Sequence, residues 1–175
     1  MSEPGHTGGD DERLDRIWAP WRLDYVKAIH DDRDDGCIFC IPAETARDRE
    51  RHIIVRRPLC FAVLNRYPYN NGHLLVAPVR HVAALDGLSG DELTALMELV
   101  RDCIALLGRA LAPHGYNVGL NLGRAAGAGI DAHLHFHIVP RWAGDTNFMP
   151  ATANTKVMPQ SLDALWDLLR EQAAS

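Results

Sequence analysis

The 175-residue sequence lacks any apolar run that approaches the length needed to span a bilayer. Its first twelve residues are acidic and rich in glycine, and they contain no hydrophobic signal segment. We therefore expect a cytoplasmic protein that does not bind membranes. Because residues 1–12 also show no hydrophobic periodicity, they are predicted to form a disordered tail, followed by a single domain over residues 13–175.

An excess of positive charge is lacking as well. The 18 Lys and Arg residues are outnumbered by 23 Asp and Glu residues, which gives a formal net charge of −5. This balance argues against a broad nucleic-acid-binding surface. Hydrophobic residues make up 47% of the chain, which is enough for a substantial core in one domain of this length. The expected partner is therefore a small molecule.

Cysteine is scarce, and four cysteines in a chain of this length do not suggest a disulfide framework. Two of them form Cys37-Ile38-Phe39-Cys40, a spacing typical of a metal knuckle or a redox pair. Redox pairs of the thioredoxin kind follow a strand and open a helix, whereas here an Asp-rich loop precedes the pair and Pro42 follows it. We therefore favour zinc. Cys60 and Cys103 lie in apolar runs and are expected to be small buried residues.

Histidine is plentiful, and three of the nine histidines stand at alternate positions: His133, His135 and His137. A β-strand places alternate residues on one face, so the three rings are predicted to share a face. The residues between them are apolar and would face a core: Leu134, Phe136 and Ile138. A run that only binds metal is the alternative. In a strand, however, the Cα atoms of His133 and His137 would lie about 13 Å apart, so at most two of the three rings can comfortably bind the same ion.

The remaining pattern predicts an α+β domain, with an antiparallel β-meander, one long helix and a C-terminal helix. Ser89 and Glu92 form a capping box, and apolar residues from Leu93 to Leu111, Met97 among them, recur at helical spacing. The long helix is expected from Gly90 to about Ala112, and the last one from near Ser161. Strands are expected at residues 52–56, 59–65, 73–77, 116–121 and 132–140.

A tetrahedral structural zinc needs four nitrogen or sulfur ligands, and Cys37 and Cys40 supply two of them. His81, which follows the third expected strand, and His133, the first of the triad, are candidates for the others. A closed site of four ligands would brace the fold without polarising a substrate. If zinc takes His133, the other two triad histidines remain for a reaction.

A neutral imidazole is a competent nucleophile at phosphorus. The central His135 is the best placed, and we assign His137 to the phosphate oxygens and the departing oxygen. Asn121 adds a neutral donor. Glycines in the following loop would let the backbone approach a phosphate closely: Gly123, Gly127 and Gly129.

The run from His133 to Val139 resembles the signature of the histidine triad (HIT) superfamily of nucleotide hydrolases and transferases. The upstream segments Leu64–Arg66 and Gly72–Val76, and the loop from Asn121 to Gly127, are similar to further family motifs. Within the superfamily the chain resembles the bacterial diadenosine tetraphosphate hydrolase and phosphorylase branch, on the segments Trp18–Arg22 and Pro140–Met149. The resemblance covers about residues 15 to 160.

This resemblance implies a HIT-like fold with a C-terminal extension and a homodimer with two sheets joined edge to edge. It implies that His135 forms a nucleotidyl-histidine intermediate, that His137 contacts the phosphate and leaving group, and that His73 supports His137. The implied zinc ligands are Cys37, Cys40, His81 and His133. The implied substrate-binding residues are Asn65 at the ribose, Val63 near the base, and Asn121, Gly127, Ala128 and Gly129 at the phosphates.

In phosphorylases of this branch we expect a Gly-Ser pair where this chain has Ala128-Gly129, so a hydroxyl that could hold inorganic phosphate is missing. The leading hypothesis is an enzyme that cleaves dinucleoside polyphosphates, diadenosine tetraphosphate above all, through His135. Three alternatives stay open: a diadenosine tetraphosphate phosphorylase (adenylyltransferase), a nucleoside phosphoramidase, and a catalytically idle nucleotide-binding module stabilised by zinc.

Overall fold

The structure, a computed structural model, describes residues 36–41, 43–146 and 157–174. The expected tail at residues 1–12 and the Trp18–Arg22 motif lie outside these ranges. The strands are β1 (Ile53–Arg56), β2 (Cys60–Leu64), β3 (Leu74–Pro78), β4 (Gly115–Leu120) and β5 (Phe136–Arg141). The helices are η2 (Leu85–Gly87), α2 (Gly90–Leu111), η3 (Arg124–Ala126) and α4 (Leu162–Ala174).

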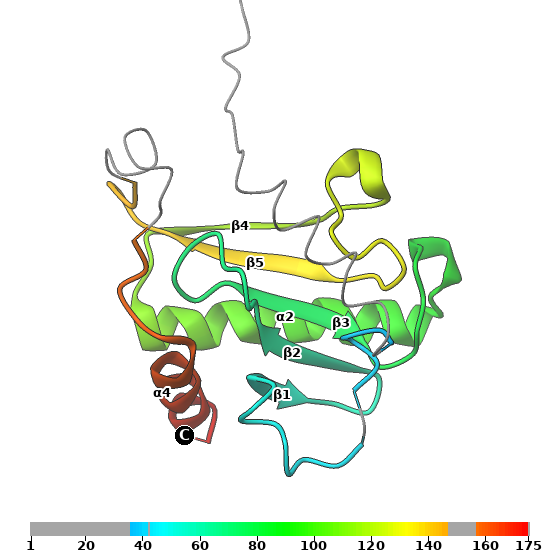
Figure 1. The fold of residues 1–175 in the computed structure, drawn as a ribbon, viewed down its shortest axis with the longest axis horizontal. Coiled ribbons are helices and arrows are strands. Elements are labelled where there is room, and N and C mark those ends of the chain that lie inside the picture. Colours follow the sequence, from blue (N-terminus) through cyan, green and yellow to red (C-terminus); the bar gives the residue numbers. More distant parts are fainter. Residues whose placement is uncertain (1–35, 42, 147–156, 175) are drawn as a thin grey trace, which may run out of the picture.

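The five strands form one antiparallel sheet in the order β1-β2-β3-β5-β4 (Figure 1). A short turn over residues 57–59 and a longer connection over residues 65–73 join β1, β2 and β3 into the expected meander. Helix α2 then carries the chain to the far edge, where β4 forms, and β5 returns between β4 and β3. The α+β class is therefore confirmed. The topology brings the histidine strand β5 next to β3, which follows His73 directly.

Helix α2 begins at the predicted capping box: the Glu92 N–H donates to the Ser89 side chain, and the Ser89 N–H donates to the Glu92 carboxylate. The helix ends where Ala112 adopts a left-handed conformation with φ of 44°. Its buried stripe differs in part from the expected one, because Leu93 and Met97 are 42% and 47% exposed. The buried face keeps four residues of the expected stripe, Leu96, Val100, Cys103 and Leu107, and adds Leu99 and Leu106.

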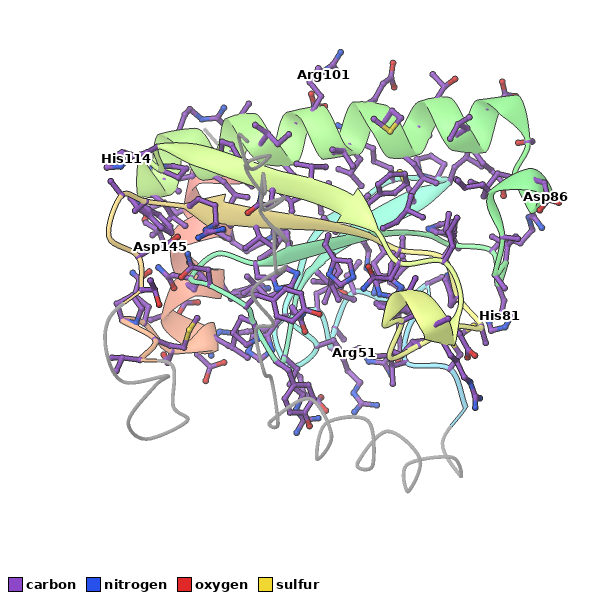
Figure 2. The ribbon with its side chains drawn as sticks, turned by 90° about the horizontal axis from the view of Figure 1, so that it is seen from above. Arg51, His81, Asp86, Arg101, His114 and Asp145 are labelled. Atoms are coloured by element: carbon purple, nitrogen blue, oxygen red, sulfur yellow. The ribbon has the colours of Figure 1, made fainter. Side chains whose placement is uncertain are left out.

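The main core lies between α2 and one face of the sheet, with α4 packed beside α2 and β1 (Figures 1 and 2). Cys60 and Cys103 are both buried in this core, as predicted. A smaller apolar cluster lies on the opposite face of the sheet: Phe39, Phe61, Leu75 and Ala77. Within the described residues, no helix combines the length and the apolarity that crossing a membrane requires.

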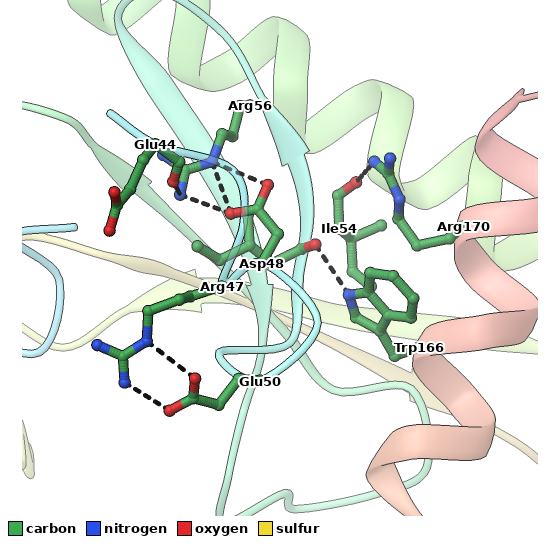
Figure 3. A network of polar contacts seen from close by, with 9 residues as sticks. Glu44, Arg47, Asp48, Glu50, Ile54, Arg56, Trp166 and Arg170 are labelled. Atoms are coloured by element: carbon green, nitrogen blue, oxygen red, sulfur yellow. Dashed lines mark hydrogen bonds and ion pairs between the residues drawn. The ribbon is translucent and has the colours of Figure 1, made fainter. Parts of the chain in front are cut away.

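Side chains of α4 cover the outer edge of the sheet at β1 (Figure 3). The Trp166 indole N–H donates to the Ile53 carbonyl at 3.0 Å, and the Arg170 guanidinium donates to the Ile54 carbonyl at 2.7 Å. Without such contacts, the backbone N–H and C=O groups of an edge strand can pair with a strand of another chain. The C-terminal helix therefore occupies edge groups at β1.

Candidate active site and metal centre

The histidine run does not lie entirely within a regular strand, because β5 begins at Phe136 rather than near residue 132. Before it, the Leu134 N–H donates to the Val82 carbonyl at 2.7 Å, and His135 Nδ1 lies 2.9 Å from the His133 carbonyl oxygen. The backbone there bonds to the segment after β3 instead of joining the ladder. The alternation still holds, since the apolar residues are buried in the main core: Leu134, Phe136 and Ile138.

Four side chains converge at one end of the sheet: Cys37, Cys40, His81 and His133. They come from three separate segments, one ahead of β1, one after β3 and one before β5. Cys40 Sγ lies 3.2 Å from His81 Nδ1, Cys37 Sγ lies 3.4 Å from His133 Nδ1, and all four ligand atoms lie within 4.8 Å of one another. The structure therefore positions these four residues to bind a metal ion.

The donor set and its surroundings fit a tetrahedral ion. A zinc tetrahedron of thiolate and imidazole ligands has ligand-to-ligand edges of about 3.3–3.8 Å, close to the spacings observed. The other nitrogen of His133, Nε2, lies 2.9 Å from the Pro78 carbonyl oxygen. It must donate there, which leaves the Nδ1 lone pair for the metal. Burial lowers the pKa of His133, which favours the neutral ring that a metal ion requires.

His135 is 7% exposed, and its Nδ1 donates to the His133 carbonyl, so Nε2 carries the lone pair. Burial lowers the pKa of His135, which favours the neutral ring that can act as a nucleophile. The ring packs against two neighbours, with centroid distances of 4.8 Å to Phe39 and 4.9 Å to His137. Phe39 lies between the two knuckle cysteines in the sequence. Its side chain therefore connects the candidate metal centre with the candidate nucleophile.

His73 and His137 are brought together across β3 and β5. His73 Nε2 lies 3.0 Å from His137 Nδ1, and His73 is only 1% exposed. The other nitrogen of His73 lies 3.2 Å from Asn65 Nδ2 and 3.0 Å from the Tyr69 backbone nitrogen. On the other side of His137, the paired residue in β4 is Gly119, and a Cβ placed there would meet nothing within 4 Å. The sheet therefore leaves room beside His137.

The expected phosphate loop follows β4 and contains η3. Asn121 Nδ2 lies 3.4 Å from the Gly127 carbonyl, and the N–H groups of Gly127 and Ala128 donate to carbonyls within the loop. Gly127 has a positive φ of 83°, which only glycine adopts readily. Ala128 and Gly129 are half-buried beside it. The structure brings these residues together, and their binding of phosphate stays a prediction.

Val63 is half-buried and packs against the smaller apolar cluster on the histidine face. An apolar surface is therefore present at Val63, and its contact with a base stays a prediction. Phe39 is the functional candidate that sequence reasoning missed, since it is 2% exposed and touches the rings of both His133 and His135. No signal in the sequence distinguishes this position from Ile38, which is 66% exposed.

The family model for the HIT domain matches residues 46–144. The chain belongs to the HIT family. A protein of Mycobacterium tuberculosis named AP-4-A phosphorylase is 41% identical to it over 160 residues, which cover 88% of this chain and 82% of that protein. An adenosine 5'-monophosphoramidase of Schizosaccharomyces pombe is 32% identical over 140 residues, covering 74% of this chain and 92% of that one.

Among solved structures, a zinc-bound histidine triad family protein from Mycobacterium smegmatis superposes with a TM-score of 0.59. Its sequence is 27% identical, and the match covers 79% of this chain and 94% of the other. Together with the family match, this likeness confirms the HIT-like fold that the sequence predicted. The relatives from M. tuberculosis and S. pombe both bear the names of enzymes whose substrates are nucleotides.

Proposed function

We propose that this HIT protein is a nucleotidyl hydrolase or transferase that cleaves dinucleoside polyphosphates, diadenosine tetraphosphate above all, through His135. One observation carries the proposal. The hydrogen bond from His135 Nδ1 to the His133 carbonyl fixes the tautomer in which Nε2 is an unprotonated, nucleophilic nitrogen. The 41% identity to a protein named AP-4-A phosphorylase supports this substrate class.

In the first step, the lone pair of His135 Nε2 attacks the α-phosphorus of one adenylyl group. The N–P bond forms as the P–O bond to the remaining chain breaks, and ATP leaves with the bonding electrons. The proton on Nδ1 stays in place, bonded to the His133 carbonyl. In the second step an acceptor attacks the phosphorus and the N–P electrons return to Nε2. Water then yields AMP and a proton, whereas inorganic phosphate yields ADP.

The other residues are proposed to bind and orient the substrate. His137 contacts the phosphate and the leaving oxygen, and His73 supports His137 through their 3.0 Å contact. Asn65 binds the ribose, and Val63 lies near the base. The phosphates are assigned to the loop after β4, namely Asn121, Gly127, Ala128 and Gly129.

The proposed metal is zinc, in a structural role. Two thiolates and two imidazoles form a ligand set typical of structural zinc, and a related solved structure is described as zinc-bound. All four protein ligands converge, so no position remains for substrate on a tetrahedral ion. Less than one zinc per chain, in protein purified without chelators, would overturn the assignment of Cys37, Cys40, His81 and His133.

A homodimer is proposed through the β4 edge of the sheet. The β1 edge is occupied in part by Trp166 and Arg170 of α4, whereas β4 is the other edge strand and Val118 on it is 44% exposed. Residues 13–175 are proposed to form one HIT domain with a C-terminal extension. A cytoplasmic location stays a prediction.

Two observations bear on the acceptor. The name of the M. tuberculosis relative favours inorganic phosphate, while Ala128-Gly129 lacks the hydroxyl that we expect to hold it. A phosphoramidase is the second candidate, because a monophosphoramidase covers 74% of this chain at 32% identity. Both alternatives share the attack by His135 and differ in the leaving group or the acceptor.

Product analysis decides among these reactions. Purified protein is incubated with diadenosine tetraphosphate, with and without inorganic phosphate. AMP plus ATP indicates asymmetric hydrolysis, ADP plus ATP that depends on phosphate indicates phosphorolysis, and two ADP would overturn attack at the α-phosphorus. An adenosine monophosphoramidate tested in parallel measures the phosphoramidase reaction. No cleavage of either substrate favours the idle binding module.

The covalent step is tested with H135A. We expect turnover to be lost while nucleotide binding stays within about tenfold of the wild type, because the removed ring reacts with the substrate more than it holds it. Wild-type protein quenched in acid-free denaturant should carry a covalently bound adenylyl group, and H135A should not. Retained turnover in H135A would refute the mechanism.

A further inference from the structure

The orientation of the Asn65 side chain is determined by its neighbours. Its Oδ1 accepts a hydrogen bond from the Tyr67 backbone N–H at 3.0 Å, so the amide cannot be flipped without losing this bond. Its Nδ2 therefore points to His73 Nδ1, at 3.2 Å. Asn65 is 7% exposed, and both ends of its amide are engaged by protein.

An amide nitrogen only donates, so Nδ1 of His73 must accept. The Tyr69 backbone N–H also points at this nitrogen, at 3.0 Å. Two donors at Nδ1 place the ring hydrogen of neutral His73 on Nε2, which lies 3.0 Å from His137 Nδ1. His73 then donates to His137, whose Nδ1 must accept. The hydrogen of neutral His137 is thereby held on Nε2.

We propose that Asn65 is a positioning residue that, together with the Tyr69 backbone N–H, sets the tautomers of His73 and His137, in addition to any contact with ribose. Through His73, it keeps a hydrogen on His137 Nε2, the nitrogen that can donate a hydrogen bond to the departing oxygen. No proton transfer is required, since a polyphosphate leaving group departs as an anion. The kinetic consequence rests on the proposed function, whereas the tautomer assignment does not.

The first test is N65L, which removes the amide at similar volume. Aryl and alkyl esters of AMP are compared, because a hydrogen bond to the leaving oxygen matters more as that oxygen becomes more basic. We expect kcat to fall about tenfold for the most basic leaving groups, and less for the most acidic ones. N71L is the matched control: Asn71 is also buried, but its amide donates to Gln160, and the dependence on leaving group should not change.

A double-mutant cycle separates this role from ribose binding. The H73Q variant can place an amide donor where His73 Nε2 stands, without needing Asn65 to select a tautomer. If Asn65 acts through His73, N65L should cost little in the H73Q background. Two results would leave Asn65 with the ribose role only and overturn the proposal. One is a fall in kcat that is equal in both backgrounds. The other is a rise in KM alone that disappears with 2'-deoxy substrates.

Histidine ¹⁵N NMR on the full chain tests the tautomers without any turnover. We expect wild-type His73 and His137 to carry hydrogen on Nε2 and not on Nδ1. In N65L the Tyr69 backbone N–H is the one remaining donor to His73 Nδ1, so we expect the fraction of His73 with hydrogen on Nδ1 to rise above the wild-type fraction. Hydrogen on Nδ1 of wild-type His73 would overturn the proposal. If the wild type cleaves no nucleotide yet shows the expected spectra, the proposed function fails, while the tautomers assigned to His73 and His137 are confirmed.

Discussion

At the scale of single residues, the three triad histidines differ in which ring nitrogen contacts a backbone carbonyl or a neighbouring histidine. His133 uses Nε2 to bond the Pro78 carbonyl, and His135 uses Nδ1 to bond the His133 carbonyl. His137 has Nδ1 next to His73. The roles that we propose therefore use Nδ1 of His133 for the metal, and Nε2 of His135 and His137 for the substrate. Hydrogen-bond partners, more than the ring itself, divide the three roles.

Phe39 gives a test of how the metal knuckle supports the nucleophile. F39L removes a ring that packs 4.8 Å from the ring of His135. We expect kcat to fall roughly tenfold to a hundredfold, since small displacements of a reacting group are costly, with metal content unchanged. F61L is the control, because Phe61 belongs to the same cluster, at 6.3 Å from Phe39. Equal losses of kcat in F39L and F61L would indicate only a general loss of packing.

Much of the site was predictable: the zinc-ligand candidates from residue types and spacing, and the support of His137 by His73 from the resemblance to the HIT superfamily. The two cysteines and two histidines proposed for zinc do converge, and His73 does meet His137. The roles of Phe39 and of the Asn65 amide were not predictable in this way. No pattern in the sequence singles out Phe39 between the two cysteines. The direction of the Asn65 hydrogen bond depends on where the folded chain places the Tyr67 and Tyr69 N–H groups.

At the scale of elements, the start of α2 carries a buried carboxylate whose charge the fold stabilises. Hydrogen bonds from Arg80 and from the Ser89 N–H lower the pKa of Glu92 to about 2. A carboxyl whose pKa is lower in the folded state adds stability at pH values above its unfolded pKa. That stability is lost as pH falls toward the folded pKa.

We therefore expect E92Q to lower the free energy of unfolding at pH 7, and the difference from the wild type to narrow between about pH 4.5 and pH 2. Urea unfolding at several pH values measures the free energy of unfolding of each protein and the pH dependence of their difference. The control is E98Q, which removes the same charge from an exposed position on the same helix. A difference between E92Q and the wild type that stays constant with pH would show that the ionised carboxylate is not the source.

The elements themselves were predicted to within a few residues, apart from the histidine strand. Its alternation was correct, but the strand starts at Phe136 because the preceding N–H of Leu134 bonds to Val82. Hydrophobic periodicity predicts the face on which a side chain lies, but it does not predict the hydrogen-bond partner of each backbone group. The stripe on α2 failed in part for a related reason, since several apolar faces were possible and the sheet selected one.

At the scale of the whole molecule, the metal centre joins segments that are far apart in the sequence. Cys37 and His133, 96 residues apart, meet there. We expect removal of the metal by chelation to lower Tm by several degrees or more, because a link across so long a loop restricts the unfolded chain. Calorimetry measures this, and adding one zinc per chain should restore Tm. An unchanged Tm in protein shown to be metal-free would argue against a structural metal.

The two edges of the sheet lead to the last prediction. Because α4 occupies backbone carbonyls at β1, association is expected at β4, where Val118 is 44% exposed. In sedimentation experiments, the wild type should have twice the chain mass of 19.4 kDa. V118E should shift it toward the monomer, since the new carboxylates would meet across the two-fold axis. L59E, at an exposed position on the β1 side, should stay dimeric. A dimer lost in L59E and kept in V118E would place the interface elsewhere.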